Sequence, residues 1–163
     1  MKSRKLTVSA MLAAAALIIF TVEAQIPALT PIPGIKLGLA NVITVFALYY
    51  LGAGEAAAIL AVRILLGSLL TGTVSAMIYS AAGGILAFAV SVMLKRFFPP
   101  KRMWIVSAFS AVAHNFGQIA AAVFVTSTPE LLWYFPVLTA SGIVTGAFTG
   151  LCASGVYGRV SKN

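Results

Sequence analysis

The chain has 163 residues, of which 61% are hydrophobic and only 9% are charged, whereas about a quarter of the residues of a soluble domain are charged. This composition excludes an ordinary soluble enzyme, and the net charge of +8 comes from basic clusters beside apolar runs, which are typical of cytoplasmic membrane loops rather than of nucleic-acid binding. Because a membrane-spanning helix needs about 20 apolar residues, the length allows about six spans and leaves no room for a second folded domain of at least about 50 residues.

Apolar runs separated by short turns predict an all-α integral membrane protein with a single transmembrane domain, residues 1–163. Between the first two runs lie three prolines and a glycine within eight positions, which cannot continue a helix. The segment 26–36 is therefore expected to be a Pro-rich external loop. The six expected spans cover residues 6–24, 35–51, 55–70, 74–94, 103–125 and 132–157.

The basic residues predict the orientation of these spans. With six spans and a cytoplasmic N-terminus, nine of the eleven Lys and Arg residues fall on the inner side, Lys36 on the outer side, and Arg63 inside the third span. The positive-inside rule therefore predicts an N-in, C-in multi-pass protein of a bacterial-type cell membrane. The first span also has the basic start and apolar stretch of a secretory signal, but the acid Glu23 before the cleavage position favours its retention. Its removal would leave the other five spans with the same orientation.

Polar residues at mid-membrane depth mark a candidate binding site. Arg63 lies about 12 Å and His114 about 16 Å from the starts of their spans, at about 1.5 Å per helical residue. In the motif HNFGQ, Gln118 is four residues from His114 and three from Asn115, spacings that bring side chains together on a helix surface. An ionisable residue at this depth costs at least about 2.5 kcal/mol and should face protein or water, which makes it a functional candidate by default.

Two further polar residues border the external loop, Lys36 at its end and Asn41 about one turn below it. Lys36 and Arg63 have no obvious buried acid nearby except Glu23, so a shared pocket would suit a carboxylate, a phosphate or a polarised carbonyl. Simpler roles stay open: Arg63 could pair with a carbonyl or with Glu55, the polar groups of HNFGQ could form interhelical hydrogen bonds, and Lys36 could extend to the membrane surface. The predicted substrate-binding residues are Lys36, Asn41, Arg63, His114, Asn115 and Gln118.

Small residues at helical spacing predict close helix packing. Three glycines spaced by four residues lie within 142–150 of the last span. An adjacent pair, Gly83 and Gly84, is expected to break the fourth span near its middle. The pair could serve helix packing, or it could open the backbone toward a ligand. An alanine strip that includes Ala10 and Ala14 lies on the first span, where it could pack internally or dock another membrane subunit.

The sequence lacks the usual signatures of catalysis. It contains no GxxxxGK[ST] motif for binding ATP phosphates, no pair of carboxylates for Mg²⁺ and, with one His and one Cys, no metal-site spacing. We expect neither an enzyme nor a cofactor or metal, although Ser75 or Ser80 could still meet His114 in space, and we interpret Cys152 as a packing residue. With no acid placed mid-span as an ion carrier, a partner ATPase is the simpler source of energy for any transport.

Several motifs together resemble a known family. IPGIKLGLAN at 32–41, AAGG at 81–84, HNFGQ at 114–118 and the Gly-rich last span are similar to the small Gx transporter family, whose members are often labelled "heptaprenyl diphosphate synthase component I". That family is similar to the S components of energy-coupling factor (ECF) transporters, which share a six-helix fold. The resemblance implies a substrate-binding membrane subunit for a small solute, with a lid at 27–36. It also implies partners, namely two ATPases and a coupling membrane subunit that docks at Ala10 and Ala14.

The family label leaves an alternative function, a noncatalytic membrane component associated with heptaprenyl or polyprenyl diphosphate or quinone synthesis. Prenyl synthases bind diphosphate through Asp-rich motifs, and this chain contains no Asp, which argues against catalysis by the chain itself. A purely structural assembly subunit is the third interpretation. In that case, alanine at Arg63 or His114 would affect folding without abolishing any ligand effect.

Overall fold

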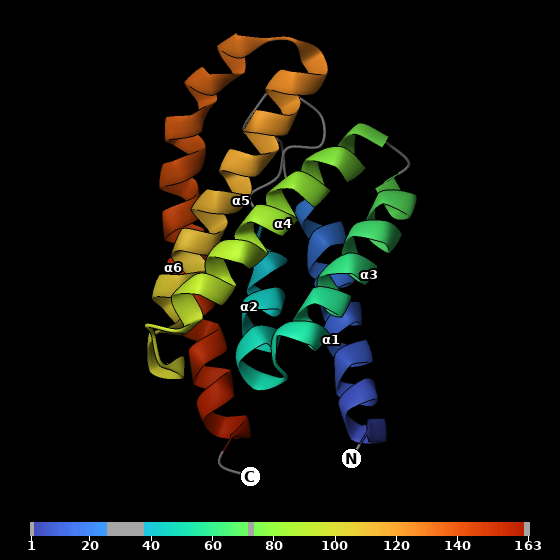
Figure 1. Ribbon diagram of the computed structural model, residues 1–163, viewed down its shortest axis with the longest axis vertical. Helices are drawn as coiled ribbons and strands as arrows, with labels where there is room; N and C mark the ends of the chain where they lie inside the picture. Colours follow the sequence, from blue (N-terminus) through green and yellow to red (C-terminus); the bar gives the residue numbers. More distant parts are fainter. Residues whose placement is uncertain (1, 26–37, 72–73, 162–163) are drawn as a thin grey trace.

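The structure, a computed structural model, describes residues 2–25, 38–71 and 74–161. These residues form six α-helices and two short 3₁₀ helices, with no β-strand among them, so the predicted all-α fold is confirmed (Figure 1). The elements are α1 (Lys2–Glu23), α2 (Asn41–Tyr50), α3 (Ala53–Thr71), α4 (Val74–Lys95), η1 (Pro100–Arg102), α5 (Met103–Thr126), η2 (Pro129–Tyr134) and α6 (Phe135–Val160).

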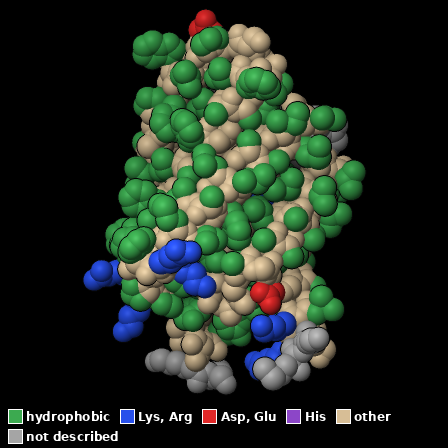
Figure 2. Space-filling model, viewed as in Figure 1, with side chains coloured by type: hydrophobic (Ala, Val, Ile, Leu, Met, Phe, Trp, Pro, Cys, Tyr) green, Lys and Arg blue, Asp and Glu red, His purple; other side chains and the backbone are tan. Residues whose placement is uncertain are grey.

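Successive helices run in alternate directions, and both ends of the chain lie at the same end of the molecule (Figure 1). The structure has five helices that are long and apolar enough to cross a membrane, namely α1, α3, α4, α5 and α6. Helix α5 packs extensively against both α4 and α6, while α1 packs mainly against α3. Many large hydrophobic side chains are exposed on the outer surface, as Figure 2 shows for one face, and this is the arrangement expected of a protein surrounded by lipid.

The second helix is shorter than the span expected at 35–51. Helix α2 has ten residues, about 15 Å at 1.5 Å per residue, which is half of a hydrocarbon core of about 30 Å. The helix cannot extend back through Gly38, whose φ of +78° is a left-handed conformation that interrupts a regular helix. Residues 35–37 lie outside the described part. Despite its length, α2 contacts all five other helices and buries Val45 and Leu48 in the core. It forms the centre of the bundle.

Glycines determine how closely the helices approach. The strip in α6 packs directly on α5: a Cβ at Gly146 would lie 2.8 Å from Cα of Ala108, and a Cβ at Gly150 would lie 2.5 Å from Cα of Trp104. Neither position has space for a side chain, which confirms the predicted packing role. The break expected at Gly83-Gly84 is wrong, because α4 continues through both residues; glycine weakens a helix without ending it where neighbouring helices hold the backbone.

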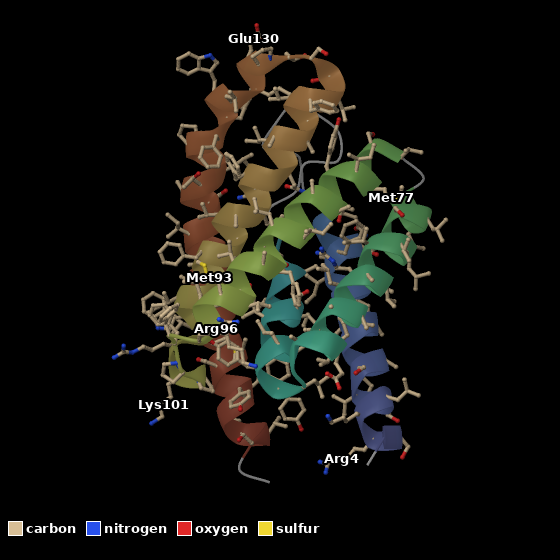
Figure 3. All side chains as sticks on the ribbon, viewed as in Figure 1. Arg4, Met77, Met93, Arg96, Lys101 and Glu130 are labelled. Atoms are coloured by element: carbon tan, nitrogen blue, oxygen red, sulfur yellow. The ribbon has the colours of Figure 1, made fainter. Side chains whose placement is uncertain are left out.

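The two ends of the molecule differ in charge. Arg4, Arg96 and Lys101 lie at the end that carries both termini, whereas Glu130 lies at the opposite end (Figure 3). Figure 2 shows the Lys and Arg side chains of this face gathered at the same end. This distribution is the one that the positive-inside rule associates with a cytoplasmic N-terminus and C-terminus.

Candidate functional site

A small cavity lies among α1, α3, α4 and α5, and five of its eight lining residues have polar side chains. The free space inside it is only about that of one water molecule, so a larger ligand can enter only if the lining side chains move apart. Arg63 on α3 and His114 on α5 each follow the start of their helix by ten or eleven residues, which places them about 15 Å from the basic end, near mid-membrane. The lining residues are Phe20, Glu23, Gly38, Arg63, Ala76, Ser80, His114 and Gln118.

Arg63 is the most unusual member of this lining, because an arginine is buried to 1% exposure inside a membrane helix. Its Nε and Nη2 atoms have no hydrogen-bond acceptor among the described residues. The Glu23 carboxylate at the end of α1, itself buried, is near enough to interact electrostatically with the guanidinium. The pairing with Glu55 is wrong, because Glu55 lies 3.6 Å from Lys5 near the basic end.

The adjacent glycines of α4 make space for the polar side chains on both neighbouring helices. A Cβ at Gly84 would lie 3.2 Å from Nη2 of Arg63 on α3, whereas a Cβ at Gly83 would lie 2.7 Å from the backbone oxygen of His114 and 2.9 Å from Cγ of Gln118 on α5. His114 Nδ1, like the two Arg63 nitrogens, has no hydrogen-bond partner in the described ranges. The glycine pair therefore lets α4 fit between the two sides of the cavity.

Gly38 closes one side of the cavity. Its backbone N–H donates a hydrogen bond of 2.5 Å to Oε1 of Glu23, and a Cβ at this position would lie 2.7 Å from Cδ2 of His114. The positive φ of Gly38 is a conformation that other residues adopt only with strain. Gly38, three residues before the start of α2, is thus held between side chains of α1 and α5.

The structure places two of the other predicted ligands, Asn41 and Asn115, elsewhere. Asn41 donates a hydrogen bond of 2.8 Å to Oγ of Ser110 and lines a second, equally small cavity that also includes Gly38 in its lining. Asn115 donates a hydrogen bond of 2.6 Å to the backbone oxygen of Leu138 on α6, so it faces α6 and not the cavity that Arg63 lines. Lys36 lies outside the described residues. Of the six predicted substrate-binding residues, Arg63, His114 and Gln118 line one cavity.

Three residues of this lining, Glu23, Ser80 and Gly38, carry little signal of a binding role in the sequence. The sequence marks Glu23 as the acid before a possible cleavage position and as the one candidate buried acid near Lys36 and Arg63, but not as a ligand. Ser80 was named only as a nucleophile that could meet His114, and both line the cavity. Gly38 carried no signal of its own, because its contacts come from α1 and α5. Gly38 lies within the motif IPGIKLGLAN, which ends at Asn41, the first residue of α2.

The side chains that line the cavity can bind a ligand through charge and hydrogen bonds. The Arg63 guanidinium can bind a carboxylate or phosphate with two parallel hydrogen bonds, and an imidazole, an amide and a hydroxyl can accept or donate further bonds. No group of three or more His, Cys, Asp or Glu side chains in the described part of the chain could hold a metal ion. The donors and acceptors of this lining suit the recognition of a polar or anionic group.

The fold and the buried polar cavity define a helical integral membrane protein. In a comparison with known protein families, the family model described as heptaprenyl diphosphate synthase component I matches residues 12–156 of the chain. The chain therefore belongs to this family, in agreement with the motifs at 32–41 and 114–118. Comparisons with curated proteins and with solved structures gave no match.

Proposed function

We propose that this protein is the substrate-binding membrane subunit of an energy-coupled uptake transporter, similar to an ECF S component, and that it takes up a small anionic solute. The observation that carries the proposal is the buried Arg63 guanidinium, with two nitrogens that lack an acceptor among the described residues, in a mid-membrane cavity. Burying such a donor without a partner is unfavourable, and an ionisable residue in a spanning helix is a functional candidate by default.

The remaining lining residues favour an anion with additional polar groups. One oxygen of Glu23 accepts the Gly38 N–H, and the carboxylate moderates the charge of Arg63 without occupying all five of its donors. Gln118, one turn from His114 on α5, and Ser80 on α4 add neutral polar groups to the lining. A carboxylate or phosphate bound by Arg63, with a hydroxyl or carbonyl placed toward α5, satisfies this set.

Transport would need partners that supply energy. The chain has no phosphate-binding loop, so we assign ATP hydrolysis to separate ATPase subunits and their coupling to a membrane subunit. Ala10 and Ala14 on α1 are exposed, whereas Ala13 and Ala16 are buried. This exposed part of the alanine strip permits close approach of a partner helix, which supports α1 as the docking helix.

The test is native mass spectrometry of the detergent-purified protein, with identification of any small molecule that it retains. We expect a small anion in the wild type that is lost from Arg63→Lys, which keeps the charge but loses the planar fork, and from His114→Ala. Arg102→Lys, the same change at an exposed position, is the matched control. A wild type that carries only lipid, or equal retention by all variants, would contradict the proposal.

The family description favours a second candidate, a noncatalytic membrane component of prenyl diphosphate synthesis. Because the chain lacks Asp, catalysis would reside in a soluble partner with Asp-rich motifs. This candidate predicts that such a synthase copurifies with the protein and that prenyl product forms only when both are present. Transport would be abandoned if this result accompanied a wild type free of small anions.

A further inference from the structure

An apolar groove runs along the outside of α2, between α1 and α6. Its empty volume is about 630 Å³, and its surface is almost entirely apolar. The groove exists because α2 forms its floor while α1 and α6 form its walls. Its lining includes Leu12, Ile43, Phe46, Cys152, Ala153 and Val156.

A second hollow adjoins this groove at the basic end of the molecule. It has an empty volume of about 780 Å³ and is lined by Lys95 and Arg96, the following turn, and two tyrosines, Tyr49 and Tyr157. Lys95 is fixed in place, because its Nζ donates a hydrogen bond of 2.6 Å to the backbone oxygen of Leu48 and lies 5.6 Å from the centre of the Tyr49 ring. No acidic side chain is among the described residues that line this hollow.

Aromatic contacts join the groove to the hollow. Phe46 lines the groove and Tyr157 lines the hollow, and their ring centroids are 6.4 Å apart. Tyr50 contacts both rings, with centroid distances of 5.7 Å to Phe46 and 6.3 Å to Tyr157. On α6, Val156 of the groove directly precedes Tyr157 of the hollow. A ligand with a charged head and an apolar tail could therefore occupy both at once.

We propose that this continuous surface binds an anionic phospholipid of the cytoplasmic leaflet, with its phosphate at Lys95 and Arg96 and one acyl chain in the groove. The ten residues of α2 give the groove a floor of about 15 Å, which is the depth of one leaflet of a hydrocarbon core of about 30 Å. Basic residues next to the cytoplasmic membrane surface attract anionic lipid headgroups. This inference does not depend on the proposed transport function, because it concerns a different surface.

The proposal can be tested by native mass spectrometry of the delipidated, detergent-purified protein titrated with phosphatidylglycerol or with phosphatidylcholine. We expect tighter binding of phosphatidylglycerol, and binding about tenfold weaker in the double variant Lys95→Gln/Arg96→Gln, since each basic residue contributes severalfold to anionic-lipid affinity. The double variant Lys101→Gln/Arg102→Gln is the matched control, because it removes the same charge from exposed positions of the same loop outside the hollow.

A second variant tests the groove without touching the basic residues or the core. Cys152→Phe adds a ring at an exposed residue of the groove wall, and Leu151→Phe adds one at an exposed neighbour outside it. We expect Cys152→Phe alone to weaken phosphatidylglycerol binding. Equal binding of both lipids, equal loss in the two charge variants, or no difference between the two Phe variants would overturn the proposal. Geranylgeranyl diphosphate displacing phosphatidylglycerol at a lower concentration would also overturn it and assign the surface to a prenyl diphosphate.

Discussion

Gly83 and Gly84 are consecutive residues of α4, yet Gly83 packs on His114 of α5 and Gly84 packs beside Arg63 of α3. Successive residues of a helix point about 100° apart, so the pair presents a side-chain-free surface to two helices at once. Helix α4 thereby connects the basic side of the cavity with the imidazole side. The pair's role is to admit bulky polar groups from both neighbours.

The glycine pair predicts unequal effects of added methyl groups. Gly83→Ala should lower stability by about 1–3 kcal/mol, as overpacking does, because its Cβ would lie 2.7 Å from backbone of α5. Gly84→Ala should cost less, since its nearest neighbours are side-chain ends of Leu60 and Arg63. Thermal unfolding in detergent measures both. Gly155→Ala, which meets nothing within 4 Å, is the control, and an effect at Gly84 as large as that at Gly83 would contradict the packing described.

Glu23 and Arg63 should be energetically coupled. In a double-mutant cycle of Glu23→Gln and Arg63→Gln, we expect a coupling of about 1–3 kcal/mol, because each single variant leaves a buried charge without its opposite. The thermal stability of the four proteins in the same detergent gives this value. The cycle Lys5→Gln and Glu55→Gln, at a more exposed pair, should give less than about 1 kcal/mol. Additive effects at Glu23 and Arg63 would show that the two charges do not interact.

Asn115 and Gln118 should have opposite phenotypes. Asn115→Ala removes the hydrogen bond to Leu138 on α6 and should lower stability by about 0.5–2 kcal/mol, while the retained small molecule stays bound. Gln118→Ala should instead release that molecule from the cavity that it lines. Mass spectrometry and thermal unfolding of both variants separate the two roles. Loss of the small molecule from a fully stable Asn115→Ala would place Asn115 among the ligands.

Gly38 should be required for the closed side of the cavity. Gly38→Ala introduces a methyl 2.7 Å from the His114 ring at a residue with positive φ, so we expect a loss of stability and of retained small molecule. Gly52→Ala is the matched control, because Gly52 also has positive φ but its Cβ would meet only Glu55, at 3.5 Å. The difference between the two variants isolates the contact with His114. Equal behaviour would mean that backbone conformation alone is responsible.

The orientation can be tested by cysteine labelling in a Cys152→Ser background. A cysteine at position 130 should react with a membrane-impermeant maleimide in intact cells, whereas one at position 101 should react only after permeabilisation. The basis is the separation of Glu130 from the basic end (Figure 3) together with the positive-inside rule. Labelling with the reverse pattern would invert the topology.

The long helices could be predicted from sequence because each is a continuous apolar run whose length matches the bilayer. The start of α2 could not be predicted in this way, because Gly38 contacts Glu23 and His114, which come from other helices. The motif HNFGQ correctly identified buried polar residues. However, it did not show that Asn115, about 100° from His114 around the helix, faces α6.

The order of residues along the chain also has a consequence for biosynthesis. Helices α1 and α3 precede α5, so the ribosome delivers Glu23 and Arg63 to the membrane before His114. Inserting an isolated arginine costs at least about 2.5 kcal/mol. Before α5 is synthesised, the carboxylate of Glu23 is an opposite charge that can lower this cost for Arg63. The order of the helices therefore makes Glu23 available to Arg63 before any residue of α5 is synthesised.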